Sequence, residues 1–210
     1  MLVVVLTNES LKAELLAQGI KANVHIEWID EPGAFLHFQN ADAYIDLLFE
    51  NETERILILK QLQPKPIFVN AVLPVLNQLP EGFIRFNGWN TFLSRPLIEA
   101  ASIDEKTKTY ATEIFSLFNK NTEWTPDIPG FISARVVAMI INEAYFALKE
   151  KVSTKQEIDI AMKLGTNYPY GPFEWAGKIG LKNVYELLNN LAKTTKRYEP
   201  SELLKKEVIV

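Results

Sequence analysis

The chain has 210 residues, 48% of them apolar, and its 26 Asp and Glu residues outnumber 22 Lys and Arg residues, which gives a net charge of −4. This length allows one large or two small globular domains, and the mild acidity gives no reason to expect nucleic acid or an anionic membrane as a partner. The absence of cysteine excludes disulfides and thiolate chemistry and suits a reducing compartment. Because no stretch has the pattern of a signal peptide or of a membrane span, we expect a cytoplasmic protein.

The first 72 residues alternate short apolar runs with amphipathic segments. Strands are expected at residues 2–6, 24–29, 34–38, 43–49 and 66–72, and helices at residues 10–18 and 53–63. Such alternation is typical of a parallel sheet covered by helices.

The second part of the chain has a helical pattern. Helices are expected at residues 130–152, 154–164, 172–180, 181–193 and 200–208, and Thr154 with Glu157 forms a possible capping box. A polar stretch at residues 119–123 separates the two patterns. We therefore predict an α/β domain at residues 1–122 followed by an all-α domain at residues 123–210.

An ordered set of motifs in the helical part resembles the L-3-hydroxyacyl-CoA dehydrogenase family. It consists of Asp127-Ile-Pro-Gly-Phe-Ile-Ser-Ala-Arg135, Asn142-Glu143-Ala144, Tyr168-Pro-Tyr-Gly-Pro-Phe173 and Arg197-Tyr-Glu-Pro-Ser-Glu-Leu-Leu-Lys205. Most of these residues start, stop or join helices, so they identify a fold and carry no chemistry. The α/β part matches more weakly, through residues 40–51, Asn87-Gly-Trp-Asn90 (H-F-F-N in the family) and Leu97-Ile-Glu99 (L-V-E).

The resemblance implies an architecture and a set of ligands. The fold would be a truncated Rossmann-like sheet domain followed by a helical C-terminal domain through which the family forms homodimers. The family uses NAD as its cofactor and acyl-CoA as its substrate, in fatty-acid metabolism. Since only residues 31–33 separate two expected strands here, a helical excursion that helps to cover the acyl-CoA in the family is missing.

The cofactor loop of the family departs most from its pattern in this chain. Dinucleotides in this fold lie on a G-x-G-x-x-G turn, whose glycines allow close backbone approach to the pyrophosphate. Thr7, Glu9 and Lys12 fall on the three glycine positions, where side chains would crowd the phosphates. Asp30 stands at the ribose-binding position, although a polar strand end is the simpler interpretation. Asn70, which ends a later strand, is the other candidate cofactor-binding residue. From this loop we predict that the chain takes no cofactor.

The catalytic positions implied by the resemblance are also altered. Asn87 falls on the position of the catalytic His, and Glu99 follows twelve residues later, at the position of the Glu that orients it. Asn90 closes the H-F-F-N motif, while Val72 and Ala134 replace an assisting Ser and an assisting Asn. An amide has no pKa near neutrality, so Asn87 cannot act as a general base.

Two functions remain open from the sequence. The first is a homologue without dehydrogenase activity that binds acyl-CoA or a partner protein, and the second is an active NAD-dependent L-3-hydroxyacyl-CoA dehydrogenase. The two histidines, His25 and His37, fall on expected strands without a supporting carboxylate pattern, so no metal site is expected.

Overall fold

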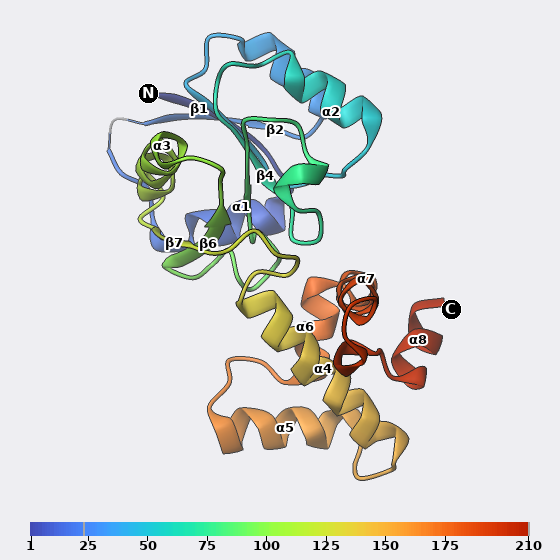
Figure 1. Cartoon of the computed structure of the whole chain (residues 1–210). Coiled ribbons are helices and arrows are strands. Elements are labelled where there is room, and N and C mark those ends of the chain that lie inside the picture. Colours follow the sequence, from blue (N-terminus) through green and yellow to red (C-terminus); the bar gives the residue numbers. More distant parts are fainter. Residues whose placement is uncertain (23, 210) are drawn as a thin grey trace. The chain divides into compact units, whose positions relative to one another are not determined.

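The computed structural model describes residues 1–22 and 24–209. The chain forms two compact units, Met1–Phe131 and Ile132–Val210. In Figure 1 the strands belong to the blue-to-yellow-green part of the chain, and the orange and red part is helical. The α/β plus all-α class predicted from the sequence is confirmed.

The first unit is built on one seven-stranded sheet with the order β2-β1-β3-β4-β5-β6-β7. Strands β1 to β5 are parallel, β6 is antiparallel to β5, and β7 is parallel to β6. The strands are β1 (Leu2–Leu6), β2 (His25–Ile29), β3 (Ala43–Asp46), β4 (Ile67–Asn70), β5 (Phe83–Phe86), β6 (Leu97–Ala101) and β7 (Asn121–Trp124). The strand order reverses at β1, so the crevice at the carboxyl ends of β1 and β3 is the switch point where open α/β sheets bind ligands.

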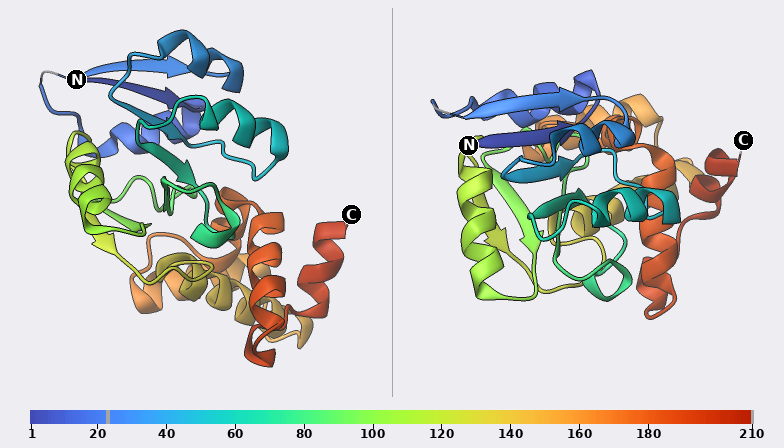
Figure 2. Two further views of the ribbon diagram at one scale, coloured as in Figure 1. Left: turned by 45° about the horizontal axis from the view of Figure 1, so that its top comes forward. Right: turned by 90° about the horizontal axis from the view of Figure 1, so that it is seen from above.

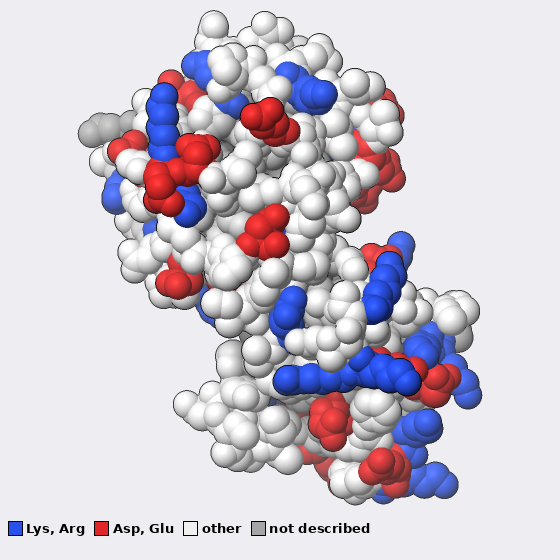
Figure 3. Space-filling model, viewed as in Figure 1, with Lys and Arg blue, Asp and Glu red and all other residues white. Residues whose placement is uncertain are grey.

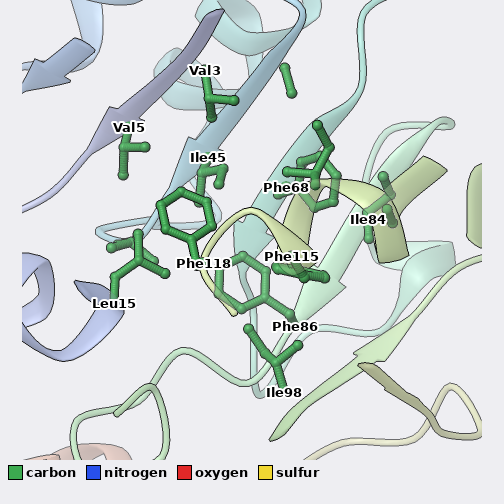
Figure 4. Close-up of a cluster of buried hydrophobic side chains, with 14 of the residues drawn as sticks. Val3, Val5, Leu15, Ile45, Phe68, Ile84, Phe86, Ile98, Phe115 and Phe118 are labelled. Atoms are coloured by element: carbon green, nitrogen blue, oxygen red, sulfur yellow. The ribbon is translucent and has the colours of Figure 1, made fainter. Parts of the chain in front are cut away.

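Helices pack on both faces of this sheet, as the views in Figure 2 indicate. Helices α1 (Glu9–Leu15) and α3 (Glu105–Ser116) cover one face, where Leu15, Phe115 and Phe118 pack against strand residues such as Val5 and Phe68 (Figure 4). The rings of Phe68 and Phe115 meet edge to face with centroids 5.2 Å apart. Helix α2 (Thr53–Lys60) and a 3-10 helix (Pro32–Phe38) cover the other face. Two further 3-10 helices are Leu16–Gln18 and Leu76–Gln78.

The second unit contains only helices among its described residues. They are α4 (Ser133–Lys149), α5 (Lys155–Thr166), α6 (Pro172–Ile179), α7 (Leu181–Ala192), a 3-10 turn (Lys196–Tyr198) and α8 (Glu202–Ile209). The capping box predicted at the start of α5 is confirmed, because Thr154 Oγ1 accepts from Glu157 N and Glu157 Oε2 accepts from Thr154 N, at 3.3 and 3.1 Å. None of the described helices has the length and apolarity needed to cross a membrane.

The connection between β2 and β3 differs from the prediction. Residues 34–38 were expected to form a strand but belong to the 3-10 helix Pro32–Phe38, which therefore also contains His37. Phe35 of this helix is fully buried and meets Tyr44 of β3 edge to face at 5.8 Å. A short apolar run has no clear period, so the sequence does not distinguish a buried strand from a buried helical turn. Here the run is buried against the sheet as a helical turn.

The division between the units also differs from the predicted one. It falls after Phe131, whereas the polar stretch at residues 119–123 suggested a boundary after residue 122. The reason is β7, which spans that stretch and pairs with β6 through Leu97↔Asn121 and three further residue pairs. Two polar side chains, on Asn121 and Glu123, are exposed at this edge of the sheet, so the composition of the strand is that of a linker.

Candidate functional site

The carboxyl end of β5 brings together the two residues expected to stand in for the catalytic pair. The antiparallel register of β5 and β6 continues past Phe86, and Asn87 N donates to Glu99 O at 2.9 Å. The Asn87 side chain then donates from Nδ2 to Glu99 Oε2 at 3.0 Å. Both side chains are buried, with exposed fractions of 2% and 4%. The spacing of twelve residues therefore becomes a direct side-chain contact.

Asn70, at the end of β4, holds the loop that follows Asn87. Its Nδ2 donates to Leu47 O at 3.0 Å, and its Oδ1 accepts from Gly88 N at 2.9 Å. A Cβ at residue 88 would lie only 2.8 Å from Asn70 Cγ, so only glycine fits there. Asn70 was predicted to be a cofactor-binding residue, but both Nδ2 and Oδ1 of its side-chain amide form hydrogen bonds with the protein backbone.

Asn90 points away from the pair. Its Nδ2 donates to Ser10 Oγ at 3.1 Å and to Glu14 Oε1 at 3.4 Å, both on α1. Glu14 also accepts from Thr91 N at 2.7 Å, at a residue whose φ of 75° is rare outside glycine. The structure thus gives Asn90 contacts that fix the turn 90–91 on α1. Glu14, which accepts hydrogen bonds from both Asn90 and Thr91, was not predicted as a site residue.

Arg85 is a second residue that was not predicted. Its side chain is fully buried at the carboxyl half of β5, and it donates to Ala71 O and Val72 O at 3.0 Å each. Its Nη1 also pairs with Asp127 Oδ1 at 2.7 Å, and its guanidinium lies 4.2 Å from the centre of the Phe131 ring. Burial lowers the pKa of Arg85, and the hydrogen bond to Asp127 partly opposes that shift. The sequence signal that could have identified Arg85 is an arginine inside the otherwise apolar strand Phe-Ile-Arg-Phe.

The carboxyl ends of β1 and β2 form the edge where a dinucleotide would approach. Thr7 and Asn8 make the turn into α1, and Asn8 Oδ1 caps that helix by accepting from Leu11 N at 2.9 Å. Glu9 points into solvent, with its side chain 95% exposed. Asp30 follows β2 and is exposed, so its carboxylate is free to meet a ligand at this edge. The topology fits a dinucleotide, whereas Thr7 and Glu9 have side chains where glycine would allow the closest approach.

Asp46 ends β3 at the switch point and is completely buried. Burial raises its pKa to about 7, although Arg55, whose Nη1 lies 3.0 Å from Oδ2, acts in the opposite direction. Leu48 N also donates to Oδ1 at 3.0 Å. This carboxyl group therefore changes its charge near neutral pH, in a position that sequence analysis did not single out.

Two positions assigned to assisting groups hold apolar residues in the structure. Val72 is buried, and its carbonyl oxygen accepts from Gly130 N at 2.8 Å in addition to Arg85. Ala134 lies in the first turn of α4, in the helical unit. Neither side chain has a hydrogen-bonding group. No group of three or more His, Asp or Glu side chains that could hold a metal ion occurs in the described part of the chain.

An open, mostly parallel sheet followed along the chain by a helical unit is the architecture of dehydrogenases with a Rossmann-like domain and a helical C-terminal domain. Residues 130–209 match the family model of the 3-hydroxyacyl-CoA dehydrogenase C-terminal domain. The helical part of the chain thus matches the 3-hydroxyacyl-CoA dehydrogenase family, which is the family that its motifs resemble.

Individual relatives agree with this assignment. Over 86 residues, 40% of this chain and 18% of the relative, it is 45% identical to 3-hydroxyadipyl-CoA dehydrogenase of Escherichia coli (strain K12). Over 134 residues, 61% of this chain and 46% of the relative, it is 34% identical to 3-hydroxybutyryl-CoA dehydrogenase of Bradyrhizobium diazoefficiens. The chain thus spans less than half the length of these two relatives.

A solved structure shows the same fold. The (S)-3-hydroxybutyryl-CoA dehydrogenase PaaH1 from Ralstonia eutropha superposes with a TM-score of 0.75 at 20% identity, over 99% of this chain and 93% of that chain. At that identity the likeness concerns the fold alone.

The prediction that the chain takes no cofactor is wrong. The relatives that match it are hydroxyacyl-CoA dehydrogenases, a family that uses NAD, and loss of the glycine pattern at Thr7, Glu9 and Lys12 is no demonstration that NAD binding is lost. The prediction relied on the side chains of a single turn, whereas the sheet still has the topology at which a dinucleotide binds. A turn of this kind can shift by a small amount to admit a ligand.

Proposed function

We propose that this chain is a 3-hydroxyacyl-CoA dehydrogenase-like protein without dehydrogenase activity that binds acyl-CoA or a partner protein. The observation that carries the proposal is the buried contact between Asn87 Nδ2 and Glu99 Oε2 at 3.0 Å. The family has a His–Glu pair at these positions. In this chain the carboxylate that would orient an imidazole accepts a hydrogen bond from an amide instead.

An amide at residue 87 cannot take part in the proton transfer that the dehydrogenase reaction needs. A general base must gain and lose a proton near the working pH, and an imidazole does so with a pKa of about 6.5. Asn87 already donates through Nδ2, and its Oδ1 is a very weak base. Val72 and Ala134 stand at the two positions where the family resemblance implies an assisting Ser and an assisting Asn, and neither side chain can form a hydrogen bond. Loss of the base concerns proton transfer alone, so the chain can lack dehydrogenase activity and still bind NAD.

An active NAD-dependent L-3-hydroxyacyl-CoA dehydrogenase is the second candidate. The relatives favour it, because those that match the chain are themselves described as 3-hydroxyacyl-CoA-type dehydrogenases. Glu99 also remains in place. This alternative needs a base other than Asn87 and makes a different prediction for turnover.

The two candidates are separated by mixing the protein with acetoacetyl-CoA and NADH and following the absorbance of NADH. The proposal predicts no turnover, and a kcat of about 1–1,000 s⁻¹ would contradict it. Separate calorimetric titrations with NAD and with acetoacetyl-CoA belong with this assay. Binding of acetoacetyl-CoA supports a ligand-binding role, and its failure to bind leaves a role in protein interaction.

We also propose that the protein forms a homodimer through its helical unit, as the family resemblance implies. Large apolar side chains are exposed on several helices of this unit, including Val136 at 54%, Ile160 at 45% and Leu164 at 84%. Ile160 and Leu164 lie one turn apart on α5 and so share a face. Sedimentation at micromolar concentration should give the dimer mass, and a monomer would contradict the proposal.

A further inference from the structure

A cavity of about 710 Å³ opens at the amino edge of the sheet in the first unit. It lies between the chain segments that enter β4 and β5 and the first turns of α3. The Asn87–Glu99 pair is at the carboxyl end of β5, so the cavity lies at the opposite end of these strands. Ligand sites in proteins usually occupy about 300–1,000 Å³, and this cavity is within that range.

The lining of this cavity is positively charged. Lys60, Lys65 and Lys106 contribute three ammonium groups, and Glu81 is the single acidic residue of the lining. The unit to which the cavity belongs is acidic, with ten Lys and Arg against seventeen Asp and Glu in residues 1–131. Three of its seven lysines thus line one cavity, although Figure 3 shows basic and acidic side chains interspersed on the visible face of this unit.

The three ammonium groups have almost no partners within the protein. Among the residues that the structure describes, none of the three donates a hydrogen bond or forms an ion pair within 4 Å. Lys106 interacts electrostatically with Asp104, but that carboxylate caps α3 and already accepts from Thr107 N and Thr107 Oγ1 at 2.8 and 2.7 Å. Like charges held on one concave surface repel, so an anion that enters the cavity relieves that repulsion.

The remaining wall is apolar and rigid. Pro64, Pro66 and Pro80 line it with Tyr110, whose hydroxyl donates to Asp42 O at 3.2 Å and so fixes the ring. The segments entering β4 and β5 are tied together by Gln63 Nε2, which donates to Glu81 O at 2.6 Å. Because prolines and a fixed ring lose little freedom when a ligand binds, such a wall favours a flat apolar group.

We propose that this cavity binds a phosphorylated small molecule of about nucleotide size. Lysine binds phosphate as a mobile point charge, and three lysines suit a group that carries two or more negative charges. The phosphate would lie among Lys60, Lys65 and Lys106, and the ring of the ligand would lie on the proline and tyrosine wall. This site is separate from the reaction site discussed above and does not depend on the proposed function.

The test is an NMR titration of the isotope-labelled full chain with AMP, with adenosine as the neutral control. AMP should shift the backbone amides of Lys65, Gly82 and Thr107, which line the cavity, and adenosine should shift them far less. The amides of Thr7 and Asp30 report on the carboxyl edge of the sheet and should change little. Shifts confined to that edge, or no saturable shift up to about 10 mM AMP, would overturn the proposal.

A matched pair of variants separates the cavity from general charge effects. Replacing Lys65→Gln and Lys106→Gln together should weaken AMP binding by at least about tenfold, because two of the three cations are lost. Lys108→Gln is the control, since Lys108 lies on the same helix but pairs with Glu105 and does not line the cavity. Equal weakening by Lys108→Gln would contradict the proposed site.

Discussion

The sharpest test of the missing general base is to restore it with Asn87→His. The Nδ1 atom of histidine and the Nδ2 atom of asparagine are both attached to Cγ, so an imidazole can direct Nδ1–H to the same Glu99 Oε2, now 3.0 Å from the amide. Its Nε2 then carries the free lone pair. Asn87 is 2% exposed, so the larger ring must displace neighbouring atoms, and some loss of stability is expected.

The expected gain follows from the contribution of general acid–base catalysis, which is about 10²–10⁴-fold. With NADH and acetoacetyl-CoA, the variant should oxidise NADH faster than the unaltered protein by a factor within that range. The new activity should follow the titration of an imidazole, with a midpoint near its ordinary pKa of about 6.5 and raised by the neighbouring Glu99.

Two control variants make this result specific. Asn87→Gln retains an amide and should show no gain, and Asn87→His combined with Glu99→Gln should lose part of the gain because the ring is no longer oriented by a carboxylate. If the histidine variant folds and binds NADH but gains no activity, the absence of a base at residue 87 is not what limits this chain. An equal gain from Asn87→Gln would refute the reasoning outright.

Three further changes test the packing and ion pairs within the two units. Gly171→Ala should lower the free energy of unfolding by about 1–3 kcal/mol, because the new Cβ would lie 2.2 Å from Asp159 Oδ1, and that carboxylate caps α6. Arg85→Met should cost roughly 3 kcal/mol in urea unfolding, since it leaves Asp127 and two backbone carbonyls without their cation. The third change is Asp46→Asn. Burial raises the pKa of Asp46 to about 7, above its unfolded value of about 3.9, so the folded state holds the proton more tightly than the unfolded state does. The stability of the unaltered protein therefore falls as pH rises from about 3.9 to about 7. The variant should abolish this fall, which amounts to at most about 4 kcal/mol.

Each of these changes has an outcome that contradicts it. Gly177→Ala is the control for Gly171, because nothing lies within 4 Å of the added Cβ, and an equal loss from both would exclude the clash as the cause. For Arg85, a loss below about 1 kcal/mol would show that the buried ion pair is not needed. For Asp46, parallel stability–pH curves for variant and unaltered protein would mean that its pKa is not raised.

Much of the fold was predictable because local signals agreed with tertiary packing. The β-branched run at residues 2–6 became β1, and the Thr154–Glu157 pattern became the cap of α5. The contact of Asn87 with Glu99 could also be anticipated, since the spacing of the two residues matched that of a known pair. For β1 and the cap of α5, one stretch of sequence carried all the information needed, whereas for Asn87 and Glu99 the family resemblance supplied it.

The remaining features depend on contacts between distant segments. Arg85 is understood only when Asp127 is placed beside it, 42 residues later in the chain. Glu14 holds the turn at Thr91 across 77 residues, and Phe35 lies in a helical turn because it packs on β3. Neither period nor composition reports such pairings, and for this reason the strand predicted at residues 34–38 was wrong.

Whether this chain lacks dehydrogenase activity is decided by the rate at which the unaltered protein oxidises NADH in the presence of acetoacetyl-CoA. It should be made under conditions in which calorimetry shows that both ligands are bound. With an amide at residue 87 hydrogen-bonded to Glu99, we expect no turnover above the rate of the Asn87→Gln variant. Turnover at about 1 s⁻¹ or faster would contradict it and would establish the chain as an active dehydrogenase.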